Sequence, residues 1–284
     1  MTIQQAQQHT LSQLKNLYDE REAANITDWV MEHLTGKKRI NRLLEKEQIL
    51  SATQIARLDI ILQELATHKP IQYVLGEAWF AGMKFFVNED VLIPRPETEE
   101  LVEWIYAESQ QSTRNHLQLL DIGTGSGCIP ISLKKKQPTL SIAALDVSKG
   151  AIAVAERNAG SLGASIHFIL VNFLNEAFWD QLPVVDIIVS NPPYIKESEQ
   201  NNMRKNVLGF EPSLALFVPD NDALLFYRKI ALFGKTNLTE EGTIFVEINE
   251  ALGKEVADLF GVNGYTVELR KDMEGKDRML KATL

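Results

Sequence analysis

The sequence contains very little cysteine, since Cys128 is the only one among 284 residues. One cysteine cannot form a disulfide within the chain, which excludes internal cross-links and favours a reducing compartment. Cys128 comes directly after a glycine-rich segment, where a small apolar side chain packs well in the helix that follows. We therefore expect a buried thiol, with a catalytic nucleophile as the alternative interpretation.

Long hydrophobic runs are also lacking. No apolar stretch approaches the roughly 18 residues needed to span a membrane, and residues 1–18 carry neither a secretory apolar segment nor an Arg-rich transit pattern. We expect no membrane association and a cytoplasmic location. The chain exceeds the usual single domain of about 100–200 residues, which predicts two cores.

Positive charge is scarce relative to negative charge. The chain has 29 Lys and Arg against 38 Asp and Glu, a formal net charge of −9. Such a surface does not attract a polyphosphate backbone, and the short basic runs at 37–39 and 134–136 are typical of solvated helix faces. Direct nucleic-acid binding is therefore not expected. The five histidines show no metal-ligand spacing, and we expect no metal.

The first part of the chain has apolar residues at helical spacing. They recur at three- and four-residue steps in three stretches, which predicts a small helical bundle. The members of these stripes are Leu11, Leu14, Leu17, Tyr18, Ile26, Trp29, Val30, Leu34, Ile55, Leu58, Ile61, Leu62 and Leu65.

From residue 69 onward the pattern changes. Two short aromatic-rich stretches, 78–83 and 84–87, predict a β-hairpin. Thr98 is then expected to cap a helix that carries Leu101, Val102 and Ile105. Beyond it, strand-like and helical segments alternate, which indicates a doubly wound parallel sheet. The expected strands are 117–120, 141–145, 166–171, 184–189 and 243–247.

A glycine loop follows the first of these strands. The loop runs through Gly123, Thr124, Gly125, Ser126 and Gly127, and a helix follows it. Glycine lets a ligand approach the backbone, and a helix N-terminus favours a carboxylate. The G-x-G-x-G spacing weakens a nicotinamide interpretation, and no G-x-x-x-x-G-K-[S/T] run occurs in the chain.

S-adenosylmethionine fits this loop better than a dinucleotide does. Asp146 lies 19 residues past Gly127 (146 − 127) at the end of the next strand, a spacing typical of an acid that binds ribose hydroxyls. We expect the methionine part of the donor at the loop and the ribose at Asp146. Asn172 would hydrogen-bond the adenine edge and Phe173 would stack on it, although a core role for Phe173 is the alternative.

The segment Asn191-Pro192-Pro193-Tyr194 follows the expected strand 184–189. Ligands of open α/β sheets bind outside the carboxyl ends of strands, and the two prolines stiffen this turn. The Asn191 carboxamide oxygen and the Pro192 carbonyl can accept the two N–H bonds of a planar NH2 group while the Tyr194 ring covers one face; Asn191 would also border the donor. The alternative is an ordinary proline-terminated strand end.

These motifs together resemble those of amino-group methyltransferases. The segment 92–99, Leu-Ile-Pro-Arg-Pro-Glu-Thr-Glu, narrows the resemblance to the protein-(glutamine-N5) methyltransferases of the HemK/PrmC type. Shorter matches at 70–73, 76, 211–216 and 275–279 extend the resemblance nearly from end to end.

Membership of this family implies an α/β fold: a doubly wound, mostly parallel seven-stranded sheet, closed by a hairpin at 265–270 and 279–283. The implied domains are a helical substrate-recognition domain at 1–68, a linker with a β-hairpin at 69–96, and an S-adenosylmethionine-dependent methyltransferase domain at 97–284. The implied reaction methylates the glutamine in the Gly-Gly-Gln loop of peptide chain release factors.

The resemblance also places Arg95 and Glu97 at the entrance of the site, with an exposed interdomain salt bridge as the alternative. Many members carry an acidic residue where this chain has Asn172, so altered donor affinity is expected there. Two further functions stay open at this point: an adenine-N6 methyltransferase that acts on nucleic acid, since a flipped adenine presents the same planar NH2, and a non-catalytic donor-binding scaffold.

Overall fold

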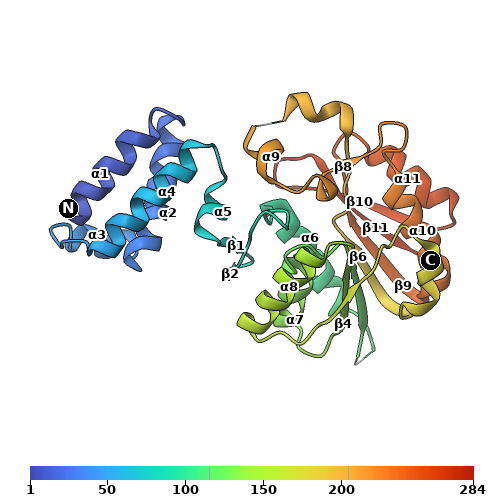
Figure 1. The fold of residues 1–284 in the computed structure, drawn as a ribbon. Helices are drawn as coiled ribbons and strands as arrows, with labels where there is room; N and C mark the ends of the chain where they lie inside the picture. The colour runs from blue at the N-terminus through green and yellow to red at the C-terminus, as the bar shows by residue number, and fades with distance from the viewer. Residues whose placement is uncertain (115, 204) are drawn as a thin grey trace. The chain divides into compact units, whose positions relative to one another are not determined.

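The computed structural model describes residues 1–114, 116–203 and 205–284, and the chain forms two compact units. The first unit comprises Met1–Gly76 and the short helix α9 (Lys205–Phe210). The second comprises Glu77–Met203 and Glu211–Leu284. Figure 1 follows the chain through both units by colour.

The first unit is helical, as the apolar stripes predict. Thr2 with Gln5, and Ser51 with Gln54, form capping boxes that satisfy backbone N–H groups at two helix starts. The buried faces pack into one core. Trp29 is an exception because 46% of it is exposed, so its place on the predicted stripe was wrong. The helices are α1 (Ile3–Leu14), α2 (Glu20–Thr35), α3 (Arg39–Leu44), α4 (Ala52–Ala66) and α5 (Ile71–Leu75).

The second unit begins with the predicted hairpin, formed by β1 (Ala78–Phe80) and β2 (Met83–Phe85). The helix α6 (Pro96–Ser109) follows, and it corrects one expectation. Arg95 occupies the N-cap position, so Thr98 lies inside the first turn and is not the cap. Proline fits the first helical position because its missing N–H has no intrahelical partner there.

A seven-stranded sheet forms the centre of the second unit, in the order β10-β11-β9-β6-β3-β4-β5. Neighbouring strands from β9 to β5 pair in parallel, whereas β11 pairs antiparallel with both β9 and β10. The predicted fold class and closing hairpin are thus confirmed. The strands are β3 (Gln118–Ile122), β4 (Ser141–Asp146), β5 (His167–Leu170), β6 (Val185–Ser190), β9 (Leu238–Glu247), β10 (Thr266–Lys271) and β11 (Asp277–Thr283).

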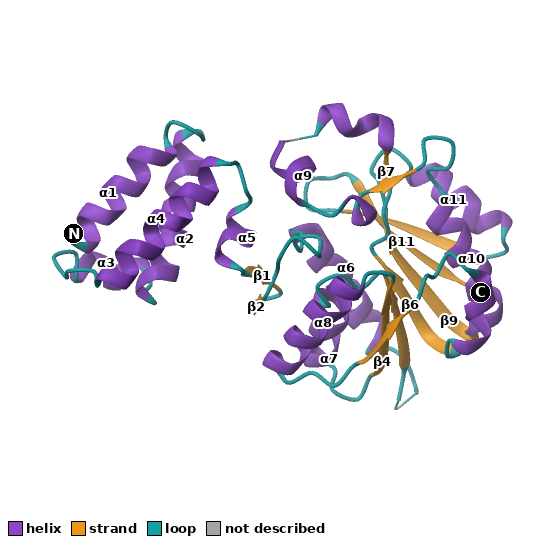
Figure 2. Ribbon diagram, in the orientation of Figure 1, coloured by secondary structure: helices purple, strands orange, loops and turns teal. Residues whose placement is uncertain are grey.

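Helices cover both faces of this sheet (Figure 2). Successive strand residues point to opposite faces, so consecutive apolar residues in a strand need a covering layer on each face. Leu119 packs in one core with α6, α7 (Cys128–Lys136) and α8 (Lys149–Leu162). Leu120 packs in the other core, with α10 (Leu225–Asn237) and α11 (Gly253–Val262). Shorter elements complete the unit: β7 (Ile195–Lys196), β8 (Phe217–Val218), and the 3₁₀ helices η1 (Glu176–Gln181), η2 (Glu197–Asn202) and η3 (Ser213–Ala215).

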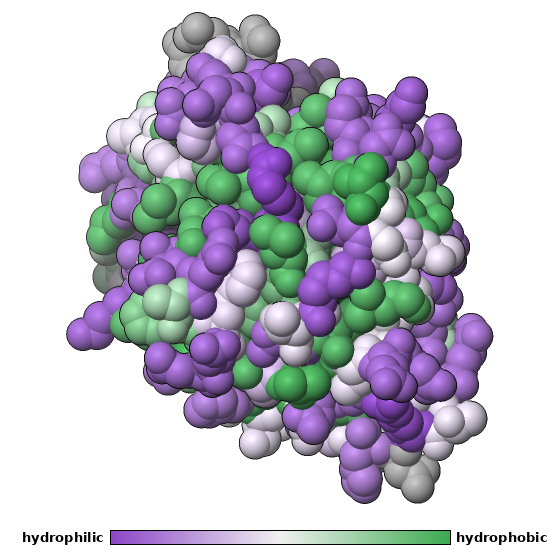
Figure 3. All heavy atoms as spheres, turned by 90° about the vertical axis from the view of Figure 1, so that its right-hand side faces the viewer, coloured by the Kyte–Doolittle hydropathy of each residue, from purple (hydrophilic) through white to green (hydrophobic). Residues whose placement is uncertain are grey.

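The surface of the second unit mixes hydrophilic and hydrophobic side chains. On the face shown in Figure 3, hydrophobic residues are interspersed with hydrophilic ones. Within the residues that the structure describes, no helix combines the length and the apolar character needed to cross a membrane.

Candidate active site

The carboxyl ends of three adjacent parallel strands bring the predicted motifs together. Ile122, the last residue of β3, pairs with Leu145 of β4 and with Ser190 of β6. The loops that follow these strands therefore open at one edge of the sheet, beside the point where the strand order reverses. A hydrogen bond from the Ser190 hydroxyl to the Ile122 carbonyl (2.7 Å) fixes the two strand ends to each other.

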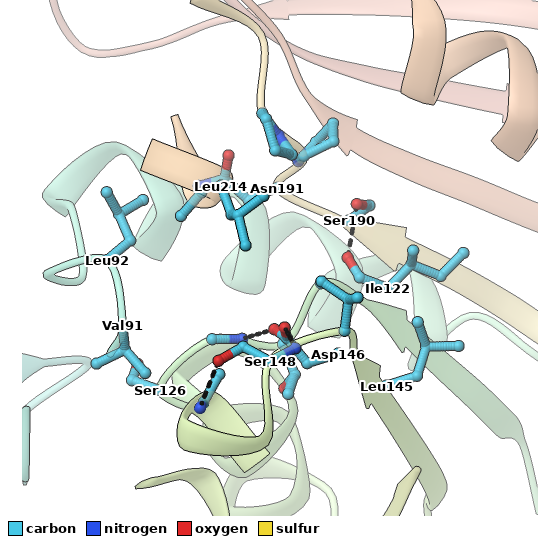
Figure 4. A pocket seen from close by; sticks show the side chains of 18 of the residues that line it. Val91, Leu92, Ile122, Ser126, Leu145, Asp146, Ser148, Ser190, Asn191 and Leu214 are labelled. Carbon is cyan, nitrogen blue, oxygen red and sulfur yellow. Dashed lines mark hydrogen bonds between the residues drawn. The ribbon is translucent and has the colours of Figure 1, made fainter. Parts of the chain in front are cut away.

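A cavity of about 300 Å³ opens at this edge (Figure 4). In the view, Asn191 and Leu214 lie across the cavity from Asp146 and Ser148. Most of the predicted site residues line it, namely Arg95, Gly123, Thr124, Gly125, Ser126, Asp146, Asn172, Phe173, Asn191, Pro192 and Pro193. Gly127, Tyr194 and Glu97 are not among its described lining residues.

The glycines of the loop have two distinct roles. Gly123 and Gly125 have positive φ (77° and 52°), and a Cβ at either position would meet no atom within 4 Å, so a ligand can approach the backbone there. Gly127 (φ 78°) is in close contact instead, because a Cβ would lie 3.0 Å from Ile131 and 3.2 Å from Ala155. The first two therefore suit ligand binding, and Gly127 suits helix packing.

Asn158, which no sequence pattern indicated, stabilises the backbone of the loop. It is 2% exposed, and its amide nitrogen donates to the carbonyls of Ser126 and Phe86, both at 2.9 Å. Its oxygen accepts the N–H of Phe86 at 2.7 Å. The three bonds tie the loop, the helix α8 and the segment after the hairpin into one rigid frame.

Buried polar atoms without a hydrogen-bond partner cluster under the loop. They are both carboxyl oxygens of Asp121 and the hydroxyls of Thr124 and Ser126. Leaving such atoms unpaired is costly, so a cluster of them beside the cavity fits a site that binds a polar ligand. Burial raises the pKa of Asp121 to about 7, an effect to which the nearby Asp146 charge adds and which the Thr124 hydroxyl opposes. Asp121 lies two residues before the predicted glycine loop, but it was not predicted as a site residue.

Asp146 stabilises the backbone of the glycine loop. Its carboxylate accepts the N–H of Gly125 and the N–H of Ser148, each at 2.9 Å. Burial raises the pKa of Asp146, whereas these backbone bonds lower it in part. A carboxylate oxygen has further acceptor capacity, so a ribose contact at Asp146 stays a prediction compatible with this geometry.

The two residues predicted for adenine lie in different surroundings. Asn172 is exposed, and its side-chain oxygen accepts the N–H of Leu174 at 3.1 Å. Phe173 is only 4% exposed, and its ring stacks on Trp179 and meets Phe233 edge-on. The location of Phe173 favours the core interpretation, while adenine binding at either residue stays a prediction.

Asn191 belongs to a hydrogen-bonded chain that sequence reasoning missed. Its Nδ2 donates to Oγ1 of Thr98 (3.2 Å), and that hydroxyl donates to Oε2 of Glu247 (2.6 Å). The hydroxyl of Tyr194 donates to Oε1 of Glu247 (3.2 Å). The Asn191 oxygen is therefore left to accept a bond from a ligand. A signal was available for Thr98, which lies in the quoted segment 92–99, but none singled out Glu247.

Arg95 pairs with Glu211 and not with Glu97. One guanidinium nitrogen lies 2.7 and 2.8 Å from the two Glu211 carboxylate oxygens, and the Ile93 N–H also donates to Glu211 (3.3 Å). Glu211 is 5% exposed, and both partners belong to the second unit. The alternative of an exposed interdomain salt bridge was therefore wrong for Arg95.

The only cysteine lines the cavity as a protonated thiol. Cys128 is 9% exposed, and burial raises its pKa to about 12. A nucleophile must ionise, so this environment argues against covalent catalysis by Cys128 and agrees with the expected buried thiol.

These residues fit S-adenosylmethionine. The hydroxyls of Thr124 and Ser126, which line the cavity, and the N–H groups of the loop suit its carboxylate. Asp121 is fully buried and is not among the described lining residues, but a negative charge directly before the loop favours the donor's ammonium group. The open space above Gly123 and Gly125 lets the ligand approach the backbone of the loop.

Comparison with known proteins agrees with this interpretation. The family model for the Methyltransferase small domain matches residues 101–208, and the model for the PrmC N-terminal domain matches residues 5–76. A methyltransferase structure from Pyrococcus furiosus has a TM-score of 0.50 at 18% identity, covering 82% of this chain and 98% of that one. At this identity the likeness shows the fold alone.

Similarity to two proteins named Release factor glutamine methyltransferase extends over nearly the whole chain. The protein from Flavobacterium psychrophilum is 45% identical over 283 residues, which is 99% of each chain. The protein from Bacteroides thetaiotaomicron is 42% identical over 270 residues, which is 95% of each chain. The resemblance inferred from the motifs is confirmed, and the chain belongs to the release factor glutamine methyltransferase family.

Proposed function

We propose that this protein transfers a methyl group from S-adenosylmethionine to the side-chain amide nitrogen (N5) of the glutamine in the Gly-Gly-Gln loop of peptide chain release factors. One observation carries the proposal. The Asn191 carboxamide lies at a cavity suited to the donor, with its nitrogen engaged by Thr98 and its oxygen left to accept a substrate N–H.

The donor is held by the glycine loop and its neighbours. Asp146 would bind the ribose hydroxyls, and the side of the cavity near Asn172 would receive adenine. The buried Asp121, directly before the loop, would stabilise the donor's ammonium group by its charge. The bound donor supplies an electrophilic methyl group on a sulfonium sulfur. The apolar lining beside Asn191, which includes Ile122 and Leu214, excludes water from the reacting nitrogen.

Positioning of the amide is the main task of the site. An amide nitrogen is a weak nucleophile because its lone pair is delocalised into the carbonyl. Holding it about 3–3.5 Å from the carbon it attacks can supply roughly 7–11 kcal/mol of the barrier. We propose that the Asn191 oxygen and the Pro192 carbonyl accept the two N–H bonds. Both bonds strengthen as positive charge grows on nitrogen, so they favour the transition state.

No strong base is needed for this reaction. As the new N–C bond forms, the electron pair of the breaking C–S bond stays on sulfur. The nitrogen then becomes acidic, and its proton passes to the solvent as the methylated amide leaves the cavity. Tyr194 is not the proton acceptor, because burial next to Glu247 raises the pKa of its hydroxyl and keeps it protonated.

The first unit is proposed to recognise the body of the release factor. It carries exposed apolar side chains on and next to α3, including Ile40, Leu43, Leu44 and Ile49. Exposed apolar clusters of this kind mark sites of protein contact. We further propose that residues 1–68 form the recognition domain, 69–96 the linker and 97–284 the catalytic domain, and that the protein acts in the cytoplasm without binding nucleic acid directly.

Labelled methyl transfer tests the proposal. The protein is incubated with S-adenosylmethionine carrying a labelled methyl group and with a release factor, with the same factor after Gln→Asn substitution in its Gly-Gly-Gln loop, or with adenine-containing DNA or RNA. We expect label only on the unmodified factor. Label on nucleic acid would overturn the proposal and support adenine-N6 methylation. If no substrate is labelled, the result would support a non-catalytic scaffold that only binds the donor.

A further inference from the structure

The hydrogen-bonded chain behind Asn191 has a defined direction. A carboxylate can only accept hydrogen bonds, so the hydroxyls of Thr98 and Tyr194 must both donate to Glu247. Thr98 has one hydroxyl hydrogen, and Glu247 takes it. The Thr98 oxygen is then an acceptor toward Asn191, and only the NH2 end of the carboxamide can donate to it.

This direction decides which end of the Asn191 side chain meets the substrate. With the NH2 end bound to Thr98, the carbonyl oxygen is the end that remains for the substrate amide. In the reversed orientation, the NH2 group of Asn191 would face the NH2 group of the substrate, and neither group could accept the hydrogen bond. The reacting amide would then lose its alignment.

We propose that Thr98 and Glu247 are positioning residues for methyl transfer, which set the orientation of the Asn191 carboxamide so that its oxygen receives the substrate NH2. The proposal rests on the function proposed above. Glu247 is not among the described lining residues of the cavity and acts through Thr98. Thr98 does line the cavity, and in this proposal it acts through its bond to Asn191.

The placement of both residues favours this role. Thr98 lies in the first turn of α6, but its hydroxyl is directed to Glu247 and not used as a helix cap. Glu247, the last residue of β9, is 2% exposed. Burial raises the pKa of its carboxyl, whereas the Thr98 hydroxyl and the Arg278 charge pull it down. A buried carboxyl is costly to maintain, and such groups concentrate at functional sites.

The Glu247 backbone provides a matched control. The buried hydroxyl of Tyr227 donates to the backbone carbonyl of Glu247 at 3.1 Å and leaves the carboxylate untouched. Tyr227→Phe therefore removes a buried hydrogen bond to the same residue without changing the direction of the chain. If Thr98 and Glu247 only join α6 to the sheet, loss of this bond should be equally harmful.

Two substitutions disturb the direction with little change of volume. Thr98→Val removes the acceptor for Asn191. Glu247→Gln places an NH2 where it can donate to the Thr98 oxygen, which frees the Thr98 hydrogen to bind the Asn191 oxygen and favours the reversed amide. We expect each to lower kcat for the release factor about 100-fold, the scale of a 1 Å misplacement, while the donor Kd and the release factor KM stay near wild type.

The controls decide between positioning and a structural role. Thr98→Ser keeps the hydroxyl and should recover most of the activity, and Tyr227→Phe should keep kcat near wild type. The proposal is overturned if Thr98→Val transfers methyl groups at the wild-type rate, or if Tyr227→Phe lowers kcat as much as Thr98→Val does. Thr98→Val decides the matter even if the Glu247→Gln protein does not fold.

A second readout separates this proposal from the proposed function. In ¹H–¹⁵N spectra, the side-chain NH2 signals of Asn191, assigned by their loss in Asn191→Ala, report the bond to Thr98. We expect them to shift in Thr98→Val and Glu247→Gln but not in Tyr227→Phe, whether or not a release factor is methylated. Unchanged signals in the first two variants would refute the orientation, and wild-type protein that methylates nothing would refute the function alone.

Discussion

The buried carboxyl of Asp121 makes the stability of the free protein depend on pH in a defined way. The pKa of this group rises from 3.8 in an unperturbed side chain to about 7. Between these values the folded protein binds one more proton than the unfolded chain, so stability falls as pH rises. One pKa unit corresponds to about 1.4 kcal/mol, so the interval of roughly three units corresponds to a loss of about 4 kcal/mol.

The substitution Asp121→Asn isolates this contribution, because asparagine is nearly the same size and never ionises. Denaturant unfolding of both proteins from pH 5 to pH 8 should show the wild type losing stability relative to the variant. Two of the three units lie between pH 5 and pH 7, so the relative loss should be about 3 kcal/mol and should level off above pH 7. A constant difference between the two proteins across this range would refute the reasoning.

Donor binding should respond in the opposite sense. The ionised Asp121 attracts the donor's ammonium group, so wild-type affinity for S-adenosylmethionine should increase as pH rises through 7, and the variant should bind weakly at every pH. Isothermal titration calorimetry measures both. Equal donor affinity of the two proteins at pH 8 would show that Asp121 does not hold the ammonium.

Three further predictions concern other parts of the molecule. Asn191→Ala should fold and bind donor but transfer almost no methyl group, and near-normal turnover would contradict the amide grip. Gly125→Ala and Gly163→Ala both place a side chain at positive φ in open space, so each should cost about 1 kcal/mol of stability, but only Gly125→Ala should weaken donor binding in calorimetry. Leu44→Glu should raise the release factor KM about tenfold or more, which is the effect of losing one hot-spot contact. Val262→Glu, at a similarly exposed position in the second unit, should leave the KM unchanged.

The fold was predictable because its signals are local. Buried parallel strands read as short apolar runs, and a glycine loop between a strand and a helix shows where the sheet binds a ligand. The edge of the sheet that carries Asn191 follows from the same rule. Helix periodicity alone could not tell that Trp29 is half exposed, because the outcome depends on how neighbouring helices pack.

The partners of the site residues were not predictable, because they join segments far apart in the chain. Thr98 meets Glu247, and Arg95 meets Glu211, across more than a hundred residues of sequence. No pattern in the sequence indicates such pairs. Thr98 was expected to act as a helix cap, since threonine is a common residue at that position. Only the fold reveals that its hydroxyl has another partner.

The most direct test of the account is the location of the methyl group on the product. Release factor treated with the protein and S-adenosylmethionine is digested, and tandem mass spectrometry locates the added mass. The account predicts one methyl group on the side-chain nitrogen of the glutamine in the Gly-Gly-Gln loop. A methyl group on any other residue, or a loop that is still unmodified when the reaction has been given time to finish, would contradict it.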